Sequence, residues 1–282
     1  MKLEARPITG KVNKLAPGVR RLLAPNPGVM TGSGTNTYLL GENEVAVVDP
    51  GPAIPEHIDA IQENAPAPIR WILVTHTHLD HSPAALPLAK MTGAELLGQK
   101  PPPGPHQDQT FTPDRELNDG DRLESPEFAI CAIHTPGHAS NHLCYLHEGL
   151  TWIFTGDHVM NGSTVVINPP DGRMDHYLTS LSRVKDLIPE KLAPGHGDLL
   201  HDPAKALDYI ITHRLEREAR VVSVLKSSGG SSLSELVKKI YDDVDVRMHA
   251  LAERSLLAHL IKLGEDKVAR EDNGQWYSAK DW

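Results

Sequence analysis

Up to about residue 200, the chain alternates short apolar runs with polar breaks. The runs are rich in β-branched residues and end at Gly, Pro, Asn or Asp, which is typical of short strands. They span residues 19–24, 37–40, 44–48, 69–74, 129–134, 142–146 and 151–154. Helical spacing of apolar positions instead predicts helices over 55–63, 83–91 and 174–187. This part of the chain is therefore predicted to be mixed α/β. The proline-rich stretch 100–114 is predicted to be a surface loop.

After residue 202 the pattern becomes helical. A broad apolar face covers 204–226, a second helix follows a cap at Ser232 or Ser234, and a third covers about 249–262. Asn273 and Gly274 then form a pair favoured in type I′ hairpin turns. Three helices and a hairpin is the order of a winged-helix module. The order also fits a plain helical extension that closes the core or forms a dimer interface.

Composition excludes several classes of protein. The chain has 282 residues, of which 39% are hydrophobic and 23% charged, as in globular domains. No apolar run is long enough for a bilayer, and the first residues lack the apolar stretch of a signal peptide. We therefore expect a cytoplasmic protein without a membrane partner. The two cysteines, Cys131 and Cys144, are too few for a disulfide framework.

Charge and histidine content suggest what the chain binds. A net charge of −9 argues against wrapping nucleic acid through bulk positive charge. The acidity belongs to residues 1–212, because basic and acidic residues balance afterwards, and this break suggests two domains. The 16 histidines include several in clusters, which indicates a metal site.

The densest cluster is THTHLDH, residues 75–81, which directly follows the predicted strand 69–74. It stands at the carboxyl end of that strand, where α/β folds place their sites. His76 and His78 are two residues apart and project to the same side in extended chain. Asp80 and His81 come as the chain turns toward the next helix, so they can reach a second ion. One short segment can thus serve two metals.

Three further loop tips supply the missing ligands. Each follows an apolar run and is flanked by Gly or Pro, which allows close approach of the backbone. These ligands are His138, Asp157 and His196. We assign His76, His78 and His138 to one ion and Asp80, His81 and His196 to the other, with Asp157 bridging both. The isolated histidines His57, His106, His147, His201 and His259 are left out of the site.

The order HTHLDH, the glycine-flanked His138, TGDH and PGHG resembles the signature of the metallo-beta-lactamase superfamily. That resemblance implies a four-layer αβ/βα sandwich with the metal site at one edge. VVDPGP resembles an earlier motif of the superfamily, in which the aspartate, here Asp49, supports metal ligands from behind. The bridging Asp157 points away from lactam chemistry and toward hydrolysis of phosphodiesters or thioesters.

A closer resemblance extends over nearly the whole chain. The stretch NPGVMTGSGTNTYLLG, the segment TGDHVM and the tail with HRLERE and SELVKKIY are similar to the beta-lactamase-like protein 2 family. This family combines a compact catalytic domain with a carboxy-terminal winged helix. The resemblance implies a catalytic domain over 1–205 and a winged-helix domain over 206–282.

The predicted chemistry is hydrolysis by a hydroxide that bridges two metal ions. Zinc suits the set of imidazoles and carboxylates, although manganese and iron also accept such ligands. Asp80 is predicted to orient the hydroxide or take its proton. His158, next to Asp157, is a candidate acid for the leaving group, and its alternative role is to support a metal ligand.

Three functions remain open. The resemblance favours an endoribonuclease, a phosphodiesterase acting on single-stranded RNA, although the acidic catalytic domain argues against phosphate binding. The alternative is a glyoxalase II-like hydrolase of a small ester or thioester. The third is a non-catalytic winged-helix binding protein, which the complete ligand set disfavours. A homodimer is also possible.

Overall fold

The strands near the amino terminus pair into a seven-stranded mixed sheet in the computed structural model, which describes residues 8–279. The sheet runs in sequence order, antiparallel from the first strand to the fourth and parallel thereafter. Its strands are β1 (Asn13–Ala16), β2 (Val19–Leu23), β3 (Asn36–Leu40), β4 (Val45–Val48), β5 (Ile69–Leu73), β6 (Glu95–Gly98) and β7 (Arg115–Glu116).

A second sheet of five strands follows in the chain. Its order is β12-β11-β10-β9-β8, and only the pair β11 and β12 is parallel. The strands are β8 (Arg122–Glu124), β9 (Ala129–His134), β10 (Leu143–His147), β11 (Trp152–Gly156) and β12 (Lys191–Pro194). Antiparallel neighbours need only short turns, whereas the parallel pair needs the long connection that contains a helix.

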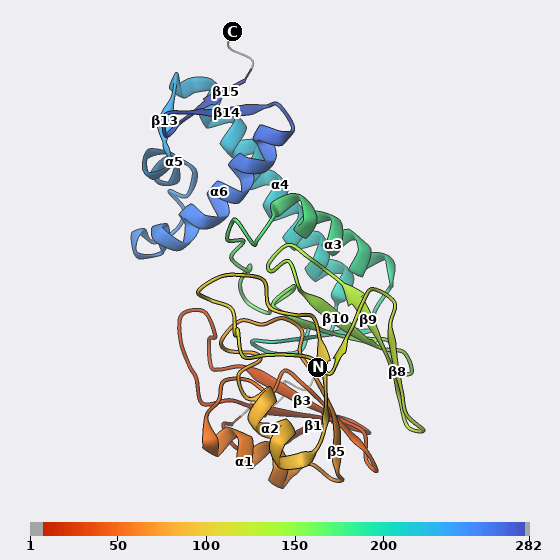
Figure 1. The fold of residues 1–282 in the computed structure, drawn as a ribbon. Helices are drawn as coiled ribbons and strands as arrows, with labels where there is room; N and C mark the ends of the chain where they lie inside the picture. The colour runs from red at the N-terminus through yellow and green to blue at the C-terminus, as the bar shows by residue number, and fades with distance from the viewer. Residues whose placement is uncertain (1–7, 280–282) are drawn as a thin grey trace. The chain divides into compact units, whose positions relative to one another are not determined.

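Two apolar cores cover the two faces of the first sheet. One core lies between the sheets and includes Tyr38, Leu73 and Phe154. The other joins the first sheet to helices α1 (Pro55–Asn64) and α2 (Ala85–Thr92), which lie beside it in Figure 1. Burial on both sides explains why the central strands are continuous apolar runs and do not alternate with polar residues.

The rest of the chain is mainly helical. Its helices are α3 (Met174–Asp186), α4 (Pro203–Ser228), α5 (Leu233–Ile240), the 3₁₀ turn η1 (Val246–Met248) and α6 (His249–Glu265). A small sheet of β13 (Ser231–Ser232), β15 (Gln275–Ser278) and β14 (Ala269–Asp272) completes the winged helix. Ser232 is the N-cap of α5, and Asn273 and Gly274 both have positive φ, as the predicted cap and hairpin turn require. The winged-helix order predicted from the sequence is confirmed.

By their internal contacts, the residues form two compact units. The first consists of the chain up to Thr135 together with Asn141–Thr164 and Leu187–Pro203. The second consists of Pro136–Ser140, Val165–Asp186 and the chain from Ala204 onward. The predicted division between 205 and 206 remains a prediction, and helix α4 runs across it without a break.

The predicted surface loop 100–114 is irregular, as its prolines require, but its surface position is wrong for part of it. Asp108 and Phe111 are only 5% and 2% exposed. The backbone N–H of Asp108 donates to the Thr77 carbonyl, and the Ser82 hydroxyl donates to the Asp108 carboxylate. The middle of this loop is therefore packed behind the HTHLDH segment.

Within residues 8–279, no helix combines the length and the apolar character that crossing a bilayer demands.

Candidate metal centre

The HTHLDH segment leaves the carboxyl end of β5, one of the two inner strands of the parallel part of the first sheet. Backbone hydrogen bonds hold the start of this segment, because Val74 donates to Leu97 and the Thr75 carbonyl accepts from Leu143. His76 and His81 are almost fully buried, whereas His78 and Asp80 are partly exposed. The segment therefore has two of these side chains buried and two partly exposed to solvent.

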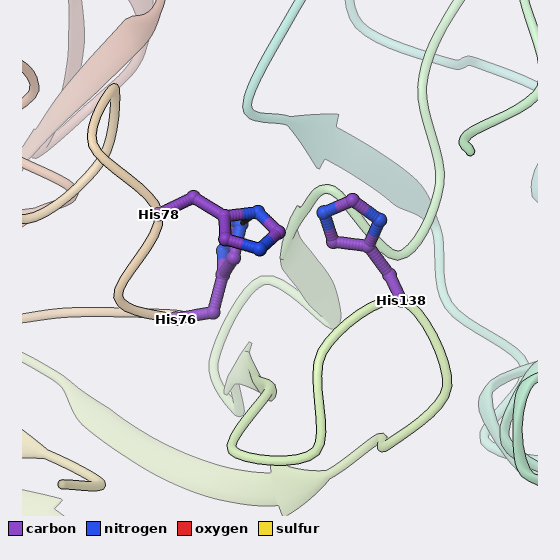
Figure 2. A group of neighbouring side chains, drawn as sticks. All are labelled: His76, His78 and His138. Atoms are coloured by element: carbon purple, nitrogen blue, oxygen red, sulfur yellow. Dashed lines mark hydrogen bonds between the residues drawn. The ribbon is translucent and has the colours of Figure 1, made fainter. Parts of the chain in front are cut away.

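His76, His78 and His138 form the first group. Their ligand atoms all lie within 4.8 Å of one another, and Figure 2 shows the rings of His78 and His138 facing each other near His76. His76 Nε2 and His78 Nδ1 are 2.9 Å apart. Three convergent imidazole nitrogens are a common ligand set for zinc, which binds them at about 2.0–2.1 Å.

Asp80, His81, Asp157 and His196 form the second group, also with ligand atoms within 4.8 Å of one another. His196 Nε2 lies 3.2 Å from Asp80 Oδ2 and 3.3 Å from Asp157 Oδ1. The Nε2 atoms of His81 and His196 are buried, and carboxylate oxygens of Asp80 and Asp157 lie 3.2–3.6 Å from them. A cation between the four side chains would give these atoms a partner, so the residues fit a metal ion.

Oxygen atoms behind the rings determine which nitrogen of each histidine faces the site. His81 Nδ1 lies 2.9 Å from Asp49 Oδ2, His196 Nδ1 lies 3.1 Å from the Gly34 carbonyl, and His138 Nδ1 lies 2.8 Å from the Val166 carbonyl. A ring that donates from Nδ1 presents Nε2 as its unprotonated ligand atom. These three rings are thus oriented as metal ligands require.

Asp49 is a central support of the second group. Its carboxylate accepts the Thr75 backbone N–H and the Thr75 hydroxyl, each at 2.7 Å, as well as the bond from His81. Its backbone has a φ of 49°, an uncommon value for a residue other than glycine. The arrangement matches the supporting role that the sequence resemblance implies for this residue.

In the second group, the negative carboxylates and the positively charged forms of the histidines stabilise one another. Burial alone raises the pKa of the Asp80 carboxyl, but the positive charge of His81 and the hydrogen bond from His196 hold that pKa below its usual value. Burial likewise opposes the charged form of His81, yet Asp80, Asp157 and Asp49 raise its pKa well above the ordinary value. The pKa of His196 is raised as well, since the attraction of Asp157 outweighs burial. A metal ion that binds here displaces protons from these rings.

Glycines make room for the second group, as their place beside the predicted ligands suggested. A Cβ on Gly195 would stand 2.6 Å from His81 Cε1 and 3.1 Å from Asp157 Oδ1. A Cβ on Gly156 would stand 2.4 Å from the Thr75 hydroxyl oxygen. A side chain at either position would collide with the residues that hold or support the ion.

The structure brings all seven predicted ligands into these two groups, in the predicted partition. Asp157 lies with the second group, and its bridging role remains a prediction. His158 has no exposed surface, and its ring centre lies 6.0 Å from that of His142. This burial favours a supporting role over direct contact with a substrate. Neither group includes the isolated histidines that the sequence analysis left out.

Several supporting residues were not identified from the sequence. The ring of the buried His142 stacks on His76 with centres 4.9 Å apart. In strand β3, the Asn36 side chain donates to the carbonyls of Pro194 and Gly197, and the Tyr38 hydroxyl donates to Pro194. These bonds fix the loop that carries His196. The only sequence signal was the presence of polar residues in a strand that is otherwise apolar.

Comparison with known proteins agrees with this geometry. Residues 30–196 match the family model of the metallo-beta-lactamase superfamily, and residues 232–276 match that of the beta-lactamase associated winged helix domain. The chain is 29% identical to a beta-lactamase-like protein 2 homolog of Caenorhabditis elegans, over 91% of this chain and 88% of that protein.

Two further similarities extend over almost the whole chain. The atrochrysone carboxyl ACP thioesterase of Aspergillus chevalieri is 33% identical over 94% of this chain and 88% of its own length. The crystal structure of a beta-lactamase domain protein from Burkholderia ambifaria superimposes with a TM-score of 0.81 at 19% identity, covering 98% of this chain and 95% of that one. Taken with the two His and Asp groups, these matches show that the chain belongs to the metallo-beta-lactamase superfamily, as a metal-dependent hydrolase with a carboxy-terminal winged helix.

Proposed function

We propose that this protein hydrolyses acyl thioesters with two zinc ions held by the His and Asp groups. The observation that carries the proposal is the similarity, over nearly the full length of both chains, to a protein named as an acyl carrier protein thioesterase. The endoribonuclease expected first from the sequence has weaker support, because the names of the other relatives specify no RNA substrate.

The charge of the site also favours a thioester. The segments that carry the seven metal-binding candidates, residues 75–82, 135–142, 156–159 and 194–198, contain no lysine or arginine. Enzymes that bind a phosphate backbone usually neutralise it with these residues. A thioester carbonyl is uncharged and makes no such demand. An acidic site is thus better suited to an acyl group than to RNA.

The residues of the chain divide the work of hydrolysis between them. Two bound zinc ions supply a water of lowered pKa and polarise the carbonyl of the substrate. Asp80, which is partly exposed, accepts the proton that the attacking water loses. The C–S bond then breaks, which gives a carboxylic acid and a thiol.

The leaving group explains why a buried His158 is compatible with this reaction. A thiol has a pKa of about 8.5, so a thiolate leaves without a strong acid beside it. The alkoxide released from RNA is far more basic and depends more on a proton donor. His158 has no exposed surface from which to donate a proton, and thioester hydrolysis does not require it to do so.

The test is a thiol-release assay on acyl thioesters of N-acetylcysteamine with zinc-loaded protein, beside a gel assay on labelled single-stranded RNA. We expect thiol release that falls by about 100-fold or more in Asp80→Asn and Asp157→Asn. Asp198→Asn is the matched control, because this carboxylate is 52% exposed, lies near His196 in the chain and belongs to neither group. RNA cleavage that depends on Asp157, without thiol release, would overturn the proposal in favour of the endoribonuclease.

A further inference from the structure

The loop that carries His138 is held by other residues of the second compact unit, the unit that contains the winged helix. The Arg173 backbone N–H donates to the Gly137 carbonyl at 2.8 Å, and the Ser180 hydroxyl donates to the Pro136 carbonyl at 2.9 Å. Both donors lie in or next to α3. The backbone on the amino-terminal side of His138 is thus fixed from one side.

The ring of His138 is fixed through a second segment, Val165–Ile167. The Val166 carbonyl accepts the bond from His138 Nδ1 at 2.8 Å. Helices α4 and α6 form hydrogen bonds to the residues directly before and after Val166 in the chain. The Arg214 guanidinium, from α4, donates to the Val165 carbonyl, and the Ser255 hydroxyl, from α6, accepts the Ile167 N–H at 3.2 Å.

Burial of the charged Arg214 side chain has a free-energy cost, because the guanidinium loses its contacts with water. Its side chain belongs to a residue only 3% exposed, and its Nε has no hydrogen-bond partner among the described residues. The guanidinium lies over the ring of Tyr177 at 5.6 Å from the ring centre. A buried charge with incomplete hydrogen bonding is poor evidence for a stabilising role, because desolvation offsets what the bonds contribute. Its bond to the Val165 carbonyl is the feature that connects it to the metal centre.

We propose that Arg214 and Ser255 are positioning residues for the metal centre, which hold Val165–Ile167 so that the Val166 carbonyl orients His138 Nε2 as a ligand. The helices α4 and α6 thereby have a role in metal binding that involves no nucleic acid. The role concerns the group of His76, His78 and His138, and it is independent of whether the substrate is a thioester.

The experiment measures the two metal affinities of the full-length protein by competition with a chromogenic chelator, and records the absorption spectrum of the Co²⁺ form. We expect Arg214→Met to lower the affinity for one of the two ions by about tenfold. This is the low end of the range for losing a direct support of a ligand. Ser255→Ala removes a single hydroxyl and should lower the affinity for the same ion by a smaller factor. Both variants should change the Co²⁺ spectrum.

The control is Arg217→Met, on the same helix. Arg217 is 7% exposed and donates to the Ile240 carbonyl and to Asp243, so its loss perturbs the winged helix without touching Val165–Ile167. Thermal unfolding of each variant shows whether the losses of stability are comparable. Equal metal affinities in Arg214→Met, Ser255→Ala and the wild type would overturn the proposal, as would an equal weakening by Arg217→Met. Neither outcome depends on catalytic activity, so failure of the proposed function is separately visible.

Discussion

At the scale of single residues, Asp49 supports the second metal group through hydrogen bonds behind it. It accepts three hydrogen bonds, two from Thr75 and one from His81. In Asp49→Asn one carboxylate oxygen becomes an NH₂ group, which faces a donor in either orientation. We expect the affinity for one metal ion to fall by about 10- to 100-fold, the usual effect of losing such a support.

Metal titration by calorimetry tests the role of Asp49. Asp59→Asn, on the exposed side of α1, is the control for the change of charge. Wild-type affinity for both ions in Asp49→Asn would show that Thr75 and His81 hold their positions without the carboxylate.

His57 predicts how stability depends on pH. Burial lowers its pKa from 6.5 to about 4, and its Nε2 lies 2.9 Å from the Thr37 hydroxyl oxygen. Below pH 6.5 the unfolded chain protonates His57, whereas the folded chain keeps it neutral down to about pH 4. The contribution of neutral His57 to the free energy of unfolding is therefore complete above pH 6.5 and is lost as the pH falls toward 4. Between pH 7 and pH 4.5 the loss is about 2 kcal/mol.

Urea unfolding of the metal-free protein at both pH values measures this contribution. The free energy of unfolding of His57→Gln should fall by about 2 kcal/mol less than that of the wild type over this interval, because glutamine does not titrate. Parallel losses in the two proteins would contradict the assignment to His57.

At the scale of elements, the strands and helices follow from local pattern with small errors at their ends. The helix predicted over 83–91 forms over Ala85–Thr92, and the one predicted over 174–187 forms over Met174–Asp186. The loops were harder to predict, since their positions depend on contacts with distant residues. The buried middle of the loop 100–114 is the clearest example, because Asp108 pairs with Thr77 and Ser82.

The loop of His138 also depends on a close approach between elements. Gly137 has a φ of 143°, and a Cβ there would stand 2.4 Å from Tyr177 Cα in α3. Gly137→Ala should therefore displace the loop and lower the free energy of unfolding by about 1–3 kcal/mol. It should also lower the affinity of the protein for one metal ion.

Gly120→Ala is the control that distinguishes the collision of a new Cβ with Tyr177 from the backbone strain of placing alanine at a positive φ. Gly120 has a φ of 83° and no atom within 4 Å of the position of its Cβ. Chemical denaturation and metal titration of both variants provide the comparison. If Gly120→Ala weakens metal binding as much as Gly137→Ala does, the loss cannot be due to the contact with Tyr177.

At the scale of the whole molecule, metal binding should contribute to stability. One buried and one partly exposed carboxylate converge in the site with several imidazoles, and bound ions neutralise the carboxylates only in the folded chain. An ion at 1,000 times its Kd stabilises the folded state by about 4 kcal/mol. For a chain of this size, chelation should lower the Tm by about 10 °C.

Differential scanning fluorimetry with and without a chelator measures this effect. Asp157→Asn, which removes one proposed ligand, should show a smaller decrease. A wild-type Tm unaffected by chelation of a protein shown to hold two ions would contradict the prediction.

The sequence by itself determined which ligands are present and on which local elements they lie. Ligand type, spacing within HTHLDH and the apolar runs before each loop tip are local properties, so a periodic pattern is enough to read them. The resemblance of these motifs to the metallo-beta-lactamase superfamily implied the family and the sandwich fold, and the order of helices and hairpin together with the whole-chain resemblance suggested the winged helix. The comparisons confirm all three.

The tertiary structure alone decided how those ligands are held. The support of His138 joins the ring to Val166, 28 positions further along the chain, and Ile167 to Ser255, 88 positions away. The burial of His158 likewise depends on elements that pack around it after folding. No local pattern encodes such pairs, because each depends on how distant segments meet, and that is settled only when the whole core forms.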